Sequence, residues 1–265
     1  MVKFLSISSG SSGNCYYIGN DDTAIAIDMG VGMRTLKSRL AAKGLDPSSI
    51  SCILVTHDHI DHIKDLGAAC RKLCVPVFAT ARLHDALGRH HCTRDSIGGC
   101  RRVIRSGFLY EHKGVGFLAF EVPHDATQTL GYYIDFFGET FVFMTDLGVV
   151  PEEAFVYCRQ ASHIIIESNY DTSMLLGGPY PEDLKKRIMN GYGHLSNEKC
   201  ALALGRMLHP GLKSVFLCHL SQHNNTPEAA YGCVAGELEE VSPGFGDRVL
   251  LRCLPRTEAS DLFLL

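Results

Sequence analysis

The segment Thr56–His62 holds more metal-binding chemistry than any other part of the chain. Its residues, Thr-His-Asp-His-Ile-Asp-His, include three imidazoles and two carboxylates. His57 and His59 are two positions apart, so on an extended segment they point to the same side. Asp61 and His62 follow where a helix is expected to begin, and they can turn toward the same point. Histidine and carboxylate together suit zinc and other borderline divalent metals.

Three more residues of ligand type follow apolar runs elsewhere in the chain. His124 comes after Val115–Val122, and Asp146 and His219 each follow another hydrophobic stretch. The histidine run itself follows the apolar residues Cys52–Val55. In α/β proteins the chemistry lies at the ends of strands. Each of these residues alone is more often hydrogen-bonded locally than metal-bound, but the ordered set favours a metal centre over a histidine-rich surface loop.

The segment His-x-His-x-Asp-His directly after an apolar strand resembles the signature of the metallo-β-lactamase fold superfamily. The other residues of ligand type occur in the order that this superfamily shows. The resemblance implies two divalent metal ions, zinc or manganese, with one ion held by His57, His59 and His124, a second held by Asp61, His62 and His219, and Asp146 bridging the two.

Asp28, in the segment Ala26–Gly30, also matches a position of the superfamily. There the carboxylate would orient a ligand histidine through a hydrogen bond rather than touch a metal. The alternative is that Asp28 ends its strand and caps a helix that begins near Met33. The sequence leaves both roles open.

The metal ligands alone do not select a substrate. A pair of divalent metals generates hydroxide at neutral pH and stabilises an oxyanion, which serves the hydrolysis of lactams, lactones, thioesters and phosphodiesters alike. Some lactamases of the superfamily have Cys at the position of Asp61, so the aspartate of this chain leans away from them.

Two segments outside the ligand set indicate phosphodiester cleavage. Glu167 ends the apolar strand His163–Glu167, and His194 stands just before a helix in the segment Tyr192–Asn197. Departure of an alkoxide benefits from a general acid, usually a histidine, and a neighbouring Glu would orient that histidine and raise its pKa. The pair resembles the acid machinery of superfamily nucleases such as ribonuclease Z. The alternatives are a plain loop histidine and a Glu in a simple salt bridge.

Over nearly the whole chain the sequence resembles the YycJ/WalJ/VicX family of bacterial metallo-β-lactamase-fold proteins. The segments that carry this resemblance are Ser8–Cys15, Thr56–His62, Pro123–Asp125, Thr145–Asp146, Glu167–Asn169, Pro181–Ile188, Gly193–Asn197 and Cys218–Ser221. The resemblance implies a 5′-to-3′ exonuclease acting on DNA, linked in some bacteria to mismatch repair, with repair proteins as partners. Catalysis would depend on a metal-bound hydroxide as the nucleophile, on Asp61, and on His194 with Glu167 as the acid relay.

Positive charge is concentrated in two parts of a chain whose net charge is −4. Residues Ala68–Ser106 hold eight Lys or Arg against two Asp, and a second basic spot lies shortly before His194. Lys and Arg contacts to phosphates supply affinity for nucleic acid without sequence preference. The residues expected to make such contacts are Arg101, Arg102, Lys185, Lys186 and Arg187. The alternative is that these residues form solvated faces of helices.

The composition is that of a globular protein outside the membrane. Hydrophobic residues make up 46% of the chain and charged residues 20%, and no run of about 18 apolar residues predicts a transmembrane helix. We expect no signal peptide, because Met1–Ser6 lead into a Ser/Gly stretch rather than an apolar core. The eleven cysteines include no Cys-x-x-Cys pair, so we expect reduced thiols in the cytoplasm. The sequence carries no signal of oligomeric state.

Apolar stretches and turn residues predict the order of strands and helices. Strands are expected at Val2–Ile7, Cys15–Ile18, Thr23–Asp28, Cys52–Thr56, Gly114–Val122, Leu130–Phe137, Thr140–Met144, His163–Glu167, Ser214–Cys218 and Arg248–Cys253. Helices are expected at Met33–Lys43, Ile63–Leu73, Ala81–Gly88, Pro151–Cys158, Glu182–Asn190, Asn197–Leu208 and Pro227–Glu240, with Thr80, Ser196 and Thr226 as caps. Pattern alone indicates α/β or α+β. The resemblance implies an α/β fold, the four-layer αββα metallo-β-lactamase sandwich, as a single domain over residues 1–265.

Two other classes of function stay open from the sequence. One is a small-molecule metallo-hydrolase of the cyclic phosphodiesterase or lactonase type, and such phosphodiesterases share the Ser-Gly-Asn-Cys start. The other is a non-enzymatic regulatory partner, which would keep a set of buried polar ligands unpaired at a cost in stability. The basic stretch and the segment around His194 lean toward a nucleic acid substrate.

Overall fold

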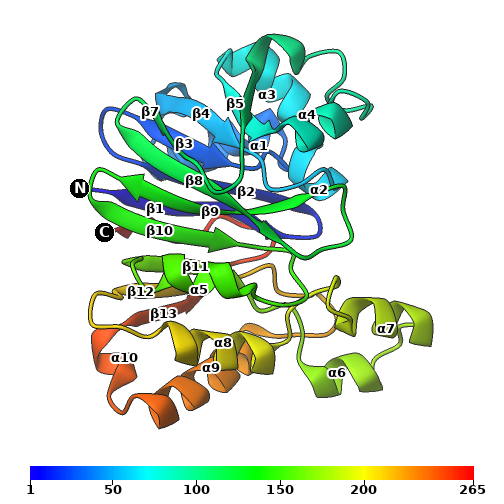
Figure 1. Cartoon of the computed structure of the whole chain (residues 1–265), viewed down its shortest axis with the longest axis vertical. Helices are drawn as coiled ribbons and strands as arrows, with labels where there is room; N and C mark the ends of the chain where they lie inside the picture. The colour runs from blue at the N-terminus through cyan, green and yellow to red at the C-terminus, as the bar shows by residue number, and fades with distance from the viewer.

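Two seven-stranded sheets pack face to face, and helices cover the outer face of each (Figure 1). The computed structural model describes all residues, 1–265. The first and last strands, β1 and β14, pair with each other, so both ends of the chain lie at the same side of the molecule. The αββα sandwich expected from the sequence is confirmed.

The first sheet, formed mostly by the amino-terminal part of the chain, has the strand order β14-β1-β2-β3-β4-β5-β6. Its strands are β1 (Lys3–Gly10), β2 (Gly13–Gly19), β3 (Ala24–Ile27), β4 (Ile50–Leu54), β5 (Val77–Thr80), β6 (Arg101–Ile104) and β14 (Phe263–Leu264). The four strands from β3 to β6 run parallel. Their carboxyl ends therefore meet at one edge of the sheet.

The second sheet has the order β13-β12-β11-β10-β9-β8-β7. Its strands are β7 (Leu109–His112), β8 (Val115–Val122), β9 (Thr129–Phe136), β10 (Glu139–Met144), β11 (His163–Glu167), β12 (Ser214–Cys218) and β13 (Leu250–Cys253). Strands β10 to β13 are parallel, and β8 runs in the same direction because β9 is antiparallel to both of its neighbours. Five carboxyl strand ends thus meet at one edge of this sheet too.

Three groups of helices surround the sheets in Figure 1. Over the first sheet lie α1 (Met33–Ala42), α3 (Leu66–Leu73) and α4 (Ala81–Leu87). Over the second lie α5 (Glu152–Cys158), α8 (Asn197–Met207), α9 (Pro227–Val241) and α10 (Phe245–Arg248). The short helices α2 (Ile60–Ile63), α6 (Thr172–Gly177) and α7 (Glu182–Met189) lie at one end of the sandwich. Two single 3₁₀ turns occupy Pro47–Ser49 and Gly98–Cys100.

The hydrophobic runs of the sequence are long because the inner strands are buried on both faces. In β11, Ile165 packs into the core between the sheets, whereas Ile164 and Ile166 pack under the helices of the second sheet. Alternating faces of one strand thus enter two different cores, and the three residues between His163 and Glu167 are all isoleucine. This is the pattern expected of parallel strands covered on both sides.

Several element boundaries differ from the prediction. The expected helix Ile63–Leu73 is two helices, α2 and α3, because the Asp65 N–H donates to the carbonyl of Met29 and the chain turns there. Strands β5, β6 and β7 and helix α6 were not predicted, since each holds only four to six residues and has no long apolar run. The expected hairpin is longer, with the Ser/Gly stretch paired as part of β1 and β2.

The predicted helix caps are confirmed. The hydroxyls of Thr80, Ser196 and Thr226 accept the N–H groups of the third residues of α4, α8 and α9. None of the helices combines the length and the apolar character needed to cross a bilayer. All eleven cysteines are unpaired thiols.

Gly30 allows the loop after β3 to approach the loop that carries the metal ligands. A Cβ atom at Gly30 would lie 1.6 Å from the carbonyl oxygen of Asp61 and 2.6 Å from the backbone nitrogen of Asn14. The Met29 N–H also donates to the carbonyl of His62, so the two loops are joined by their backbones. A side chain at this position would force them apart.

We therefore expect Gly30→Ala to lower the free energy of unfolding by about 1–3 kcal/mol, the usual cost of overpacking a closed site. The matched control is Gly232→Ala, because Gly232 is exposed in α9 and a Cβ there meets nothing within 4 Å. The control should gain up to about 1 kcal/mol from helix propensity. Urea unfolding of both variants measures the difference, and equal shifts would contradict the role given to Gly30.

Candidate metal centre and active site

The predicted site residues converge at the end of the sandwich that carries α2. His57 follows β4, His124 follows β8, Asp146 follows β10 and His219 follows β12, all at carboxyl strand ends. His59 precedes α2, while Asp61 and His62 lie within it. The parallel strands of the two sheets thus bring residues from four separate segments to one place.

Three of the residues at strand ends have a left-handed backbone. The φ angles of Asp28, Asp146 and His219 are 59°, 53° and 54°. Aspartate and histidine tolerate this region better than most residues, although it costs free energy. In each case the left-handed residue comes within two residues of the strand end, so the side chain departs from the strand alternation and joins the cluster.

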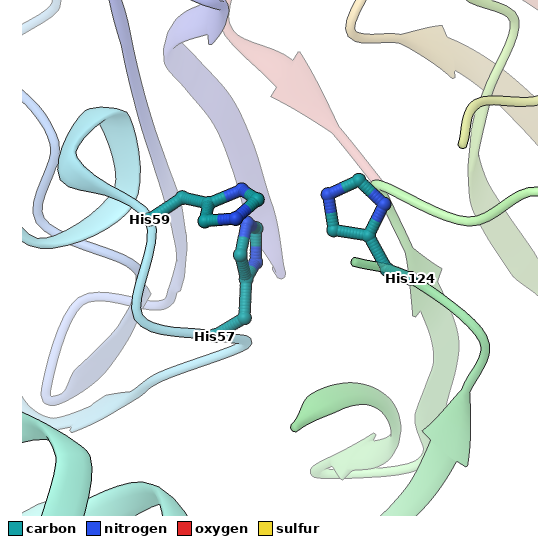
Figure 2. A group of neighbouring side chains, drawn as sticks. All are labelled: His57, His59 and His124. Atoms are coloured by element: carbon teal, nitrogen blue, oxygen red, sulfur yellow. The ribbon is translucent and has the colours of Figure 1, made fainter. Parts of the chain in front are cut away.

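Three histidines from the two sheets lie close together at this end of the sandwich (Figure 2). His57 and His59 come from the loop after β4, and His124 comes from the end of β8. Their ring centroids are 4.7 to 5.3 Å apart, and one ring nitrogen of each lies within 4.8 Å of the others. The Nδ1 atom of His124 donates to the carbonyl of Gly193 at 2.9 Å, which leaves its Nε2 as the free ligand atom.

A second group is formed by Asp61, His62 and His219, whose ligand atoms also lie within 4.8 Å of one another. The Nδ1 atom of His62 donates to Asp28 at 2.7 Å, and Nδ1 of His219 donates to Glu167 at 2.9 Å. Both hydrogen bonds fix the ring and leave Nε2 to face the centre of the group. Carboxylate partners of this kind are usual behind ligand histidines.

Asp146 lies between the two groups. Its Oδ2 is 3.2 Å from Nε2 of His62, and its Oδ1 is 3.8 Å from Nε2 of His124 and 3.5 Å from Nδ1 of His219. The Thr145 hydroxyl donates to Oδ2 at 2.8 Å. Asp146 is the residue whose carboxylate reaches members of both groups.

Asp28 lies beneath His62 and does not cap a helix. Its carboxylate accepts the N–H of Thr56 at 2.8 Å and the Thr56 hydroxyl at 2.7 Å, besides the His62 ring. The N–H of Met33 donates to Asp65 instead. Asp28 therefore does not cap the helix that begins at Met33. It lies behind the His62 ring, where a carboxylate that orients a ligand histidine is expected.

Unpartnered buried atoms show that these residues fit a metal. The Nε2 atoms of His57, His124 and His219 are buried and have no hydrogen-bond partner. Orphaned polar atoms in a protein interior are rare and costly, and here three of them face one small region. Nitrogen and carboxylate donors in this number are the ligand set of borderline divalent metals. The metallo-β-lactamase fold implies divalent metal binding, and these clusters are the candidate ligands.

The electrostatics of the cluster also favour a cation. Burial alone would lower the pKa of His62, but Asp146, Asp28 and Asp61 raise it to about 10. Burial would raise the pKa of Asp146, yet His219 and His62 hold it well below its usual value. The carboxylate of Asp146 thus stays ionised, and its negative charge favours a cation beside it. By contrast, burial together with His62 lowers the pKa of His57, which leaves this ring neutral and ready to ligate.

His194 and Glu167 form the pair expected from the sequence. Nδ1 of His194 donates to Oε1 of Glu167 at 2.7 Å. Glu167 is fully buried, and its other oxygen accepts the N–H groups of Leu147 and Leu195. Burial disfavours a charged ring, but the Glu167 carboxylate more than offsets it and raises the pKa of His194. Glu167 is therefore not in a simple salt bridge with one partner. Its carboxylate accepts hydrogen bonds from both His194 and His219.

The cluster opens into a cavity of about 290 Å³. His194, with 23% of its side chain exposed, lines the cavity together with His59, Asp61 and Asp146. Arg187, from α7, lines the rim and pairs with Asp125. The wall opposite the ligands is thus formed by α7 and the segment around it.

The residues predicted to contact nucleic acid do not lie together. Arg187 lines the cavity and Lys186 is exposed beside it on α7. The prediction that Lys185 contacts nucleic acid is wrong. Lys185 is buried, and its ammonium donates to the carbonyl of Leu176 and to Glu182. The reason is the helix period, which turns Lys185 inward while Lys186 and Arg187 are exposed.

Arg101 and Arg102 are exposed but lie on the edge strand β6 and do not line the cavity. Arg101 pairs with Val77 at the amino end of the parallel strands, whereas the ligands follow the carboxyl ends. Its guanidinium also contacts Asp85. These two arginines belong to a surface separate from the rim of the cavity.

Three supporting residues were not assigned roles from the sequence. The amide Nδ2 of Asn14 is 2.9 Å from Nε2 of His62 and donates to Asp61 at 3.2 Å. The Thr56 hydroxyl links Asp28 to Nδ1 of His57 at 3.0 Å, and Asn169 donates to the carbonyl of His219 at 2.8 Å. The available signal was their place in the segments Ser8–Cys15, Thr56–His62 and Glu167–Asn169.

Comparisons with known proteins agree with this geometry. A family model described as the β-lactamase superfamily domain matches residues 23–219, more than half of the chain and the whole ligand set. The structure is similar to that of the metallo-β-lactamase fold protein YhfI from Bacillus subtilis, with a TM-score of 0.68, 14% identity, and coverage of 98% of this chain and 100% of that one. At that identity the likeness shows the fold alone.

Two curated proteins are similar over almost their whole lengths. Exodeoxyribonuclease YycJ of Bacillus anthracis is 32% identical over 246 residues, which cover 93% of this chain and 92% of that protein. Exodeoxyribonuclease WalJ of Streptococcus pneumoniae is 30% identical over 244 residues, which cover 92% of this chain and 91% of that protein. The chain therefore belongs to the β-lactamase superfamily and, within it, to the family of the YycJ and WalJ proteins.

Proposed function

We propose that this metallo-β-lactamase superfamily hydrolase is a metal-dependent exonuclease that degrades DNA in the 5′-to-3′ direction. The observation that carries the proposal is the hydrogen bond from Nδ1 of His194 to Glu167 beside the ligand cluster. A buried acid pair of this kind serves a poor leaving group such as the alkoxide of a phosphodiester. The two relatives at 30–32% identity are named exodeoxyribonucleases, which supports DNA as the substrate.

Two divalent metal ions, zinc or manganese, would occupy the cluster. One would be held by His57, His59 and His124, the other by Asp61, His62 and His219, with Asp146 between them. When bound, such a pair lowers the pKa of a water molecule toward neutrality and neutralises the charge that develops on the phosphate. Asp28, Thr56 and Glu167 would hold the ligand rings in place from behind.

His194 would supply the proton to the departing oxygen. Its Nδ1 is held by Glu167, so Nε2 is the ring nitrogen left to face a substrate in the cavity. The carboxylate fixes the tautomer and the direction of the ring, and it stabilises the imidazolium form before transfer. Glu167 is thus a positioning residue, and His194 is the residue that touches the reacting oxygen.

DNA would approach over α7. Arg187 at the rim of the cavity and Lys186 beside it would contact phosphates near the cleaved bond. Arg101 and Arg102 would serve as outer contacts to longer DNA, and Lys185 is left out because it is buried. In the cell we place the protein in the cytoplasm, with a role in mismatch repair that follows from the family resemblance.

The central test is degradation of linear duplex DNA labelled at one 5′ end, with Mn²⁺ or Zn²⁺ added. Native protein should release the label early as short product, whereas Asp61→Ala should release none because a ligand is missing. A label at the 3′ end should persist longer if the polarity is right. Hydrolysis of small cyclic phosphodiesters or lactones by well-metallated protein, without action on DNA, would favour the small-molecule hydrolase instead.

Variants should separate metal binding from proton transfer. His194→Ala should keep the full metal content and lose about 100- to 10,000-fold in kcat on DNA, the usual contribution of a general acid. The loss on bis(p-nitrophenyl) phosphate should be much smaller, because its leaving group needs no proton. Asp146→Ala should lose metal, measured by mass spectrometry of the dialysed protein. Equal metal loss in both variants would refute this division of roles.

The phosphate contact of Lys186 can be measured through salt. Lys186→Glu should weaken DNA binding and lower the slope of log affinity against log salt by about 1 for the lost contact. The matched control is Lys37→Glu, which makes the same charge change at an exposed position of α1 on the other side of the first sheet. If both variants shift equally, overall charge rather than the α7 surface governs binding.

A further inference from the structure

A second hollow adjoins the metal centre on the other side of His124. Its volume is about 430 Å³, within the range of about 300–1,000 Å³ that is typical of sites for small organic groups. His124 lines both this hollow and the cavity of the metal centre, so the two spaces adjoin at this residue. The part of a polymer substrate next to the bond cleaved at the metal centre needs a place to bind, and this hollow adjoins that centre.

An exposed aromatic side chain forms one wall of the hollow. Tyr192 is 64% exposed although it lies only two residues before His194. Its backbone is held, because its N–H donates to Oδ1 of Asn190 at 2.7 Å and the next N–H donates to the carbonyl of Asn190 at 3.0 Å. Because the backbone at Tyr192 is already fixed, the segment loses little backbone entropy when a ligand packs on the exposed ring. Such rings are the platforms on which bases of single strands stack.

The remaining walls offer one cation and several uncharged polar groups. Arg82, exposed on α4, is the only Lys or Arg that lines the hollow. Glu121, the one carboxylate there, already accepts a hydrogen bond from Gln128 at 2.6 Å. Thr129 lines the hollow, and its hydroxyl is buried without a hydrogen-bond partner. These groups suit one nucleotide, with its phosphate at the arginine and its base against the ring.

We propose that this hollow is a nucleotide subsite for a single strand, with the base stacked on Tyr192 and a phosphate paired with Arg82. The inference rests on the proposed function and deepens it, because it specifies that the strand is unpaired next to the bond that is cleaved. Inside a duplex each base is stacked on its neighbours on both faces, so an internal base that lies flat on this ring must first leave the stack. Stacking is tolerant of sequence, so the subsite imposes no preference among bases.

The chain contains no tryptophan, which allows a direct test. Tyr192→Trp introduces a single fluorophore at the proposed subsite. The metal-loaded variant is titrated with an oligothymidylate that carries a phosphorothioate backbone and so resists cleavage. We expect an about twofold loss of emission as the base stacks. The matched control is Tyr231→Trp on α9, which is 45% exposed and lines a separate hollow beside α10. Its emission should stay unchanged, and equal changes in both variants would overturn the subsite.

Kinetics provide an independent readout. For single-stranded DNA, Tyr192→Ala should raise KM more than it lowers kcat, and Tyr192→Phe should restore most of the affinity. Relative to bis(p-nitrophenyl) phosphate, kcat/KM for DNA should fall about tenfold, as expected for one lost stacking contact. Arg82→Ala should lower the salt dependence of binding as well.

The outcomes separate this inference from the proposed function. If the native protein degrades DNA but Tyr192→Ala leaves that ratio unchanged and Tyr192→Trp shows no quenching, the subsite is wrong and the nuclease stands. If the native, metal-loaded protein cleaves neither DNA nor the small diester, the proposed function falls. In that case quenching of Tyr192→Trp by the oligonucleotide still supports the subsite, and its absence overturns the subsite too.

Discussion

Buried negative charge is the constraint on which the rest of this site depends. The carboxylates of Asp28, Asp146 and Glu167 lie almost wholly out of solvent, and Asp61 lies at the edge of the same cluster. An ionised carboxylate in a protein interior is stable only with hydrogen bonds and a counter-charge. The histidines supply part of both, and three free Nε2 atoms leave room for metal ions to supply the remainder.

The same constraint explains the strained backbone around the cluster. Asp28, Asp146 and His219 leave their strands in the left-handed region, which costs free energy at each position. The cost is tolerated because each side chain then enters a network that the surrounding sheets fix. Gly30 contributes in another way, since the absence of a side chain lets the loop after β3 lie directly against the backbone of Asp61.

Outside the cluster, the surface next to the metal centre is formed largely by α7 and the segment that follows it. The helix α7 and the segment that follows it place Arg187 and His194 at the cavity of the metal centre and Tyr192 at the adjoining hollow. Their positions relative to the ligands come from backbone hydrogen bonds, such as that of the His194 N–H to the carbonyl of Ile188 at 2.8 Å. A short segment thus carries the residues that we propose as a phosphate contact, an aromatic platform and a general acid.

Much of the site could be predicted from the sequence, because ligand chemistry is local and ordered. The segment Thr56–His62 placed three histidines and two aspartates directly after an apolar strand, and each further ligand followed another such strand. The layers of the fold followed from the same apolar runs and from the resemblance. Short strands such as β6 escaped prediction, since four residues with two arginines carry no periodic signal.

What the tertiary structure decided is which groups meet across long distances in the chain. The sequence left two roles open for Asp28. In the folded chain His62, 34 residues away, donates to the Asp28 carboxylate, which the sequence could not show. It suggested a partner for His194, but only the packing of β11 beside β12 joined Glu167 to His219 as well. It also placed Lys185 among the solvent-facing cations, whereas the helix turns it inward. Residue types determine what chemistry is available, and strand order and burial determine which of those groups act together.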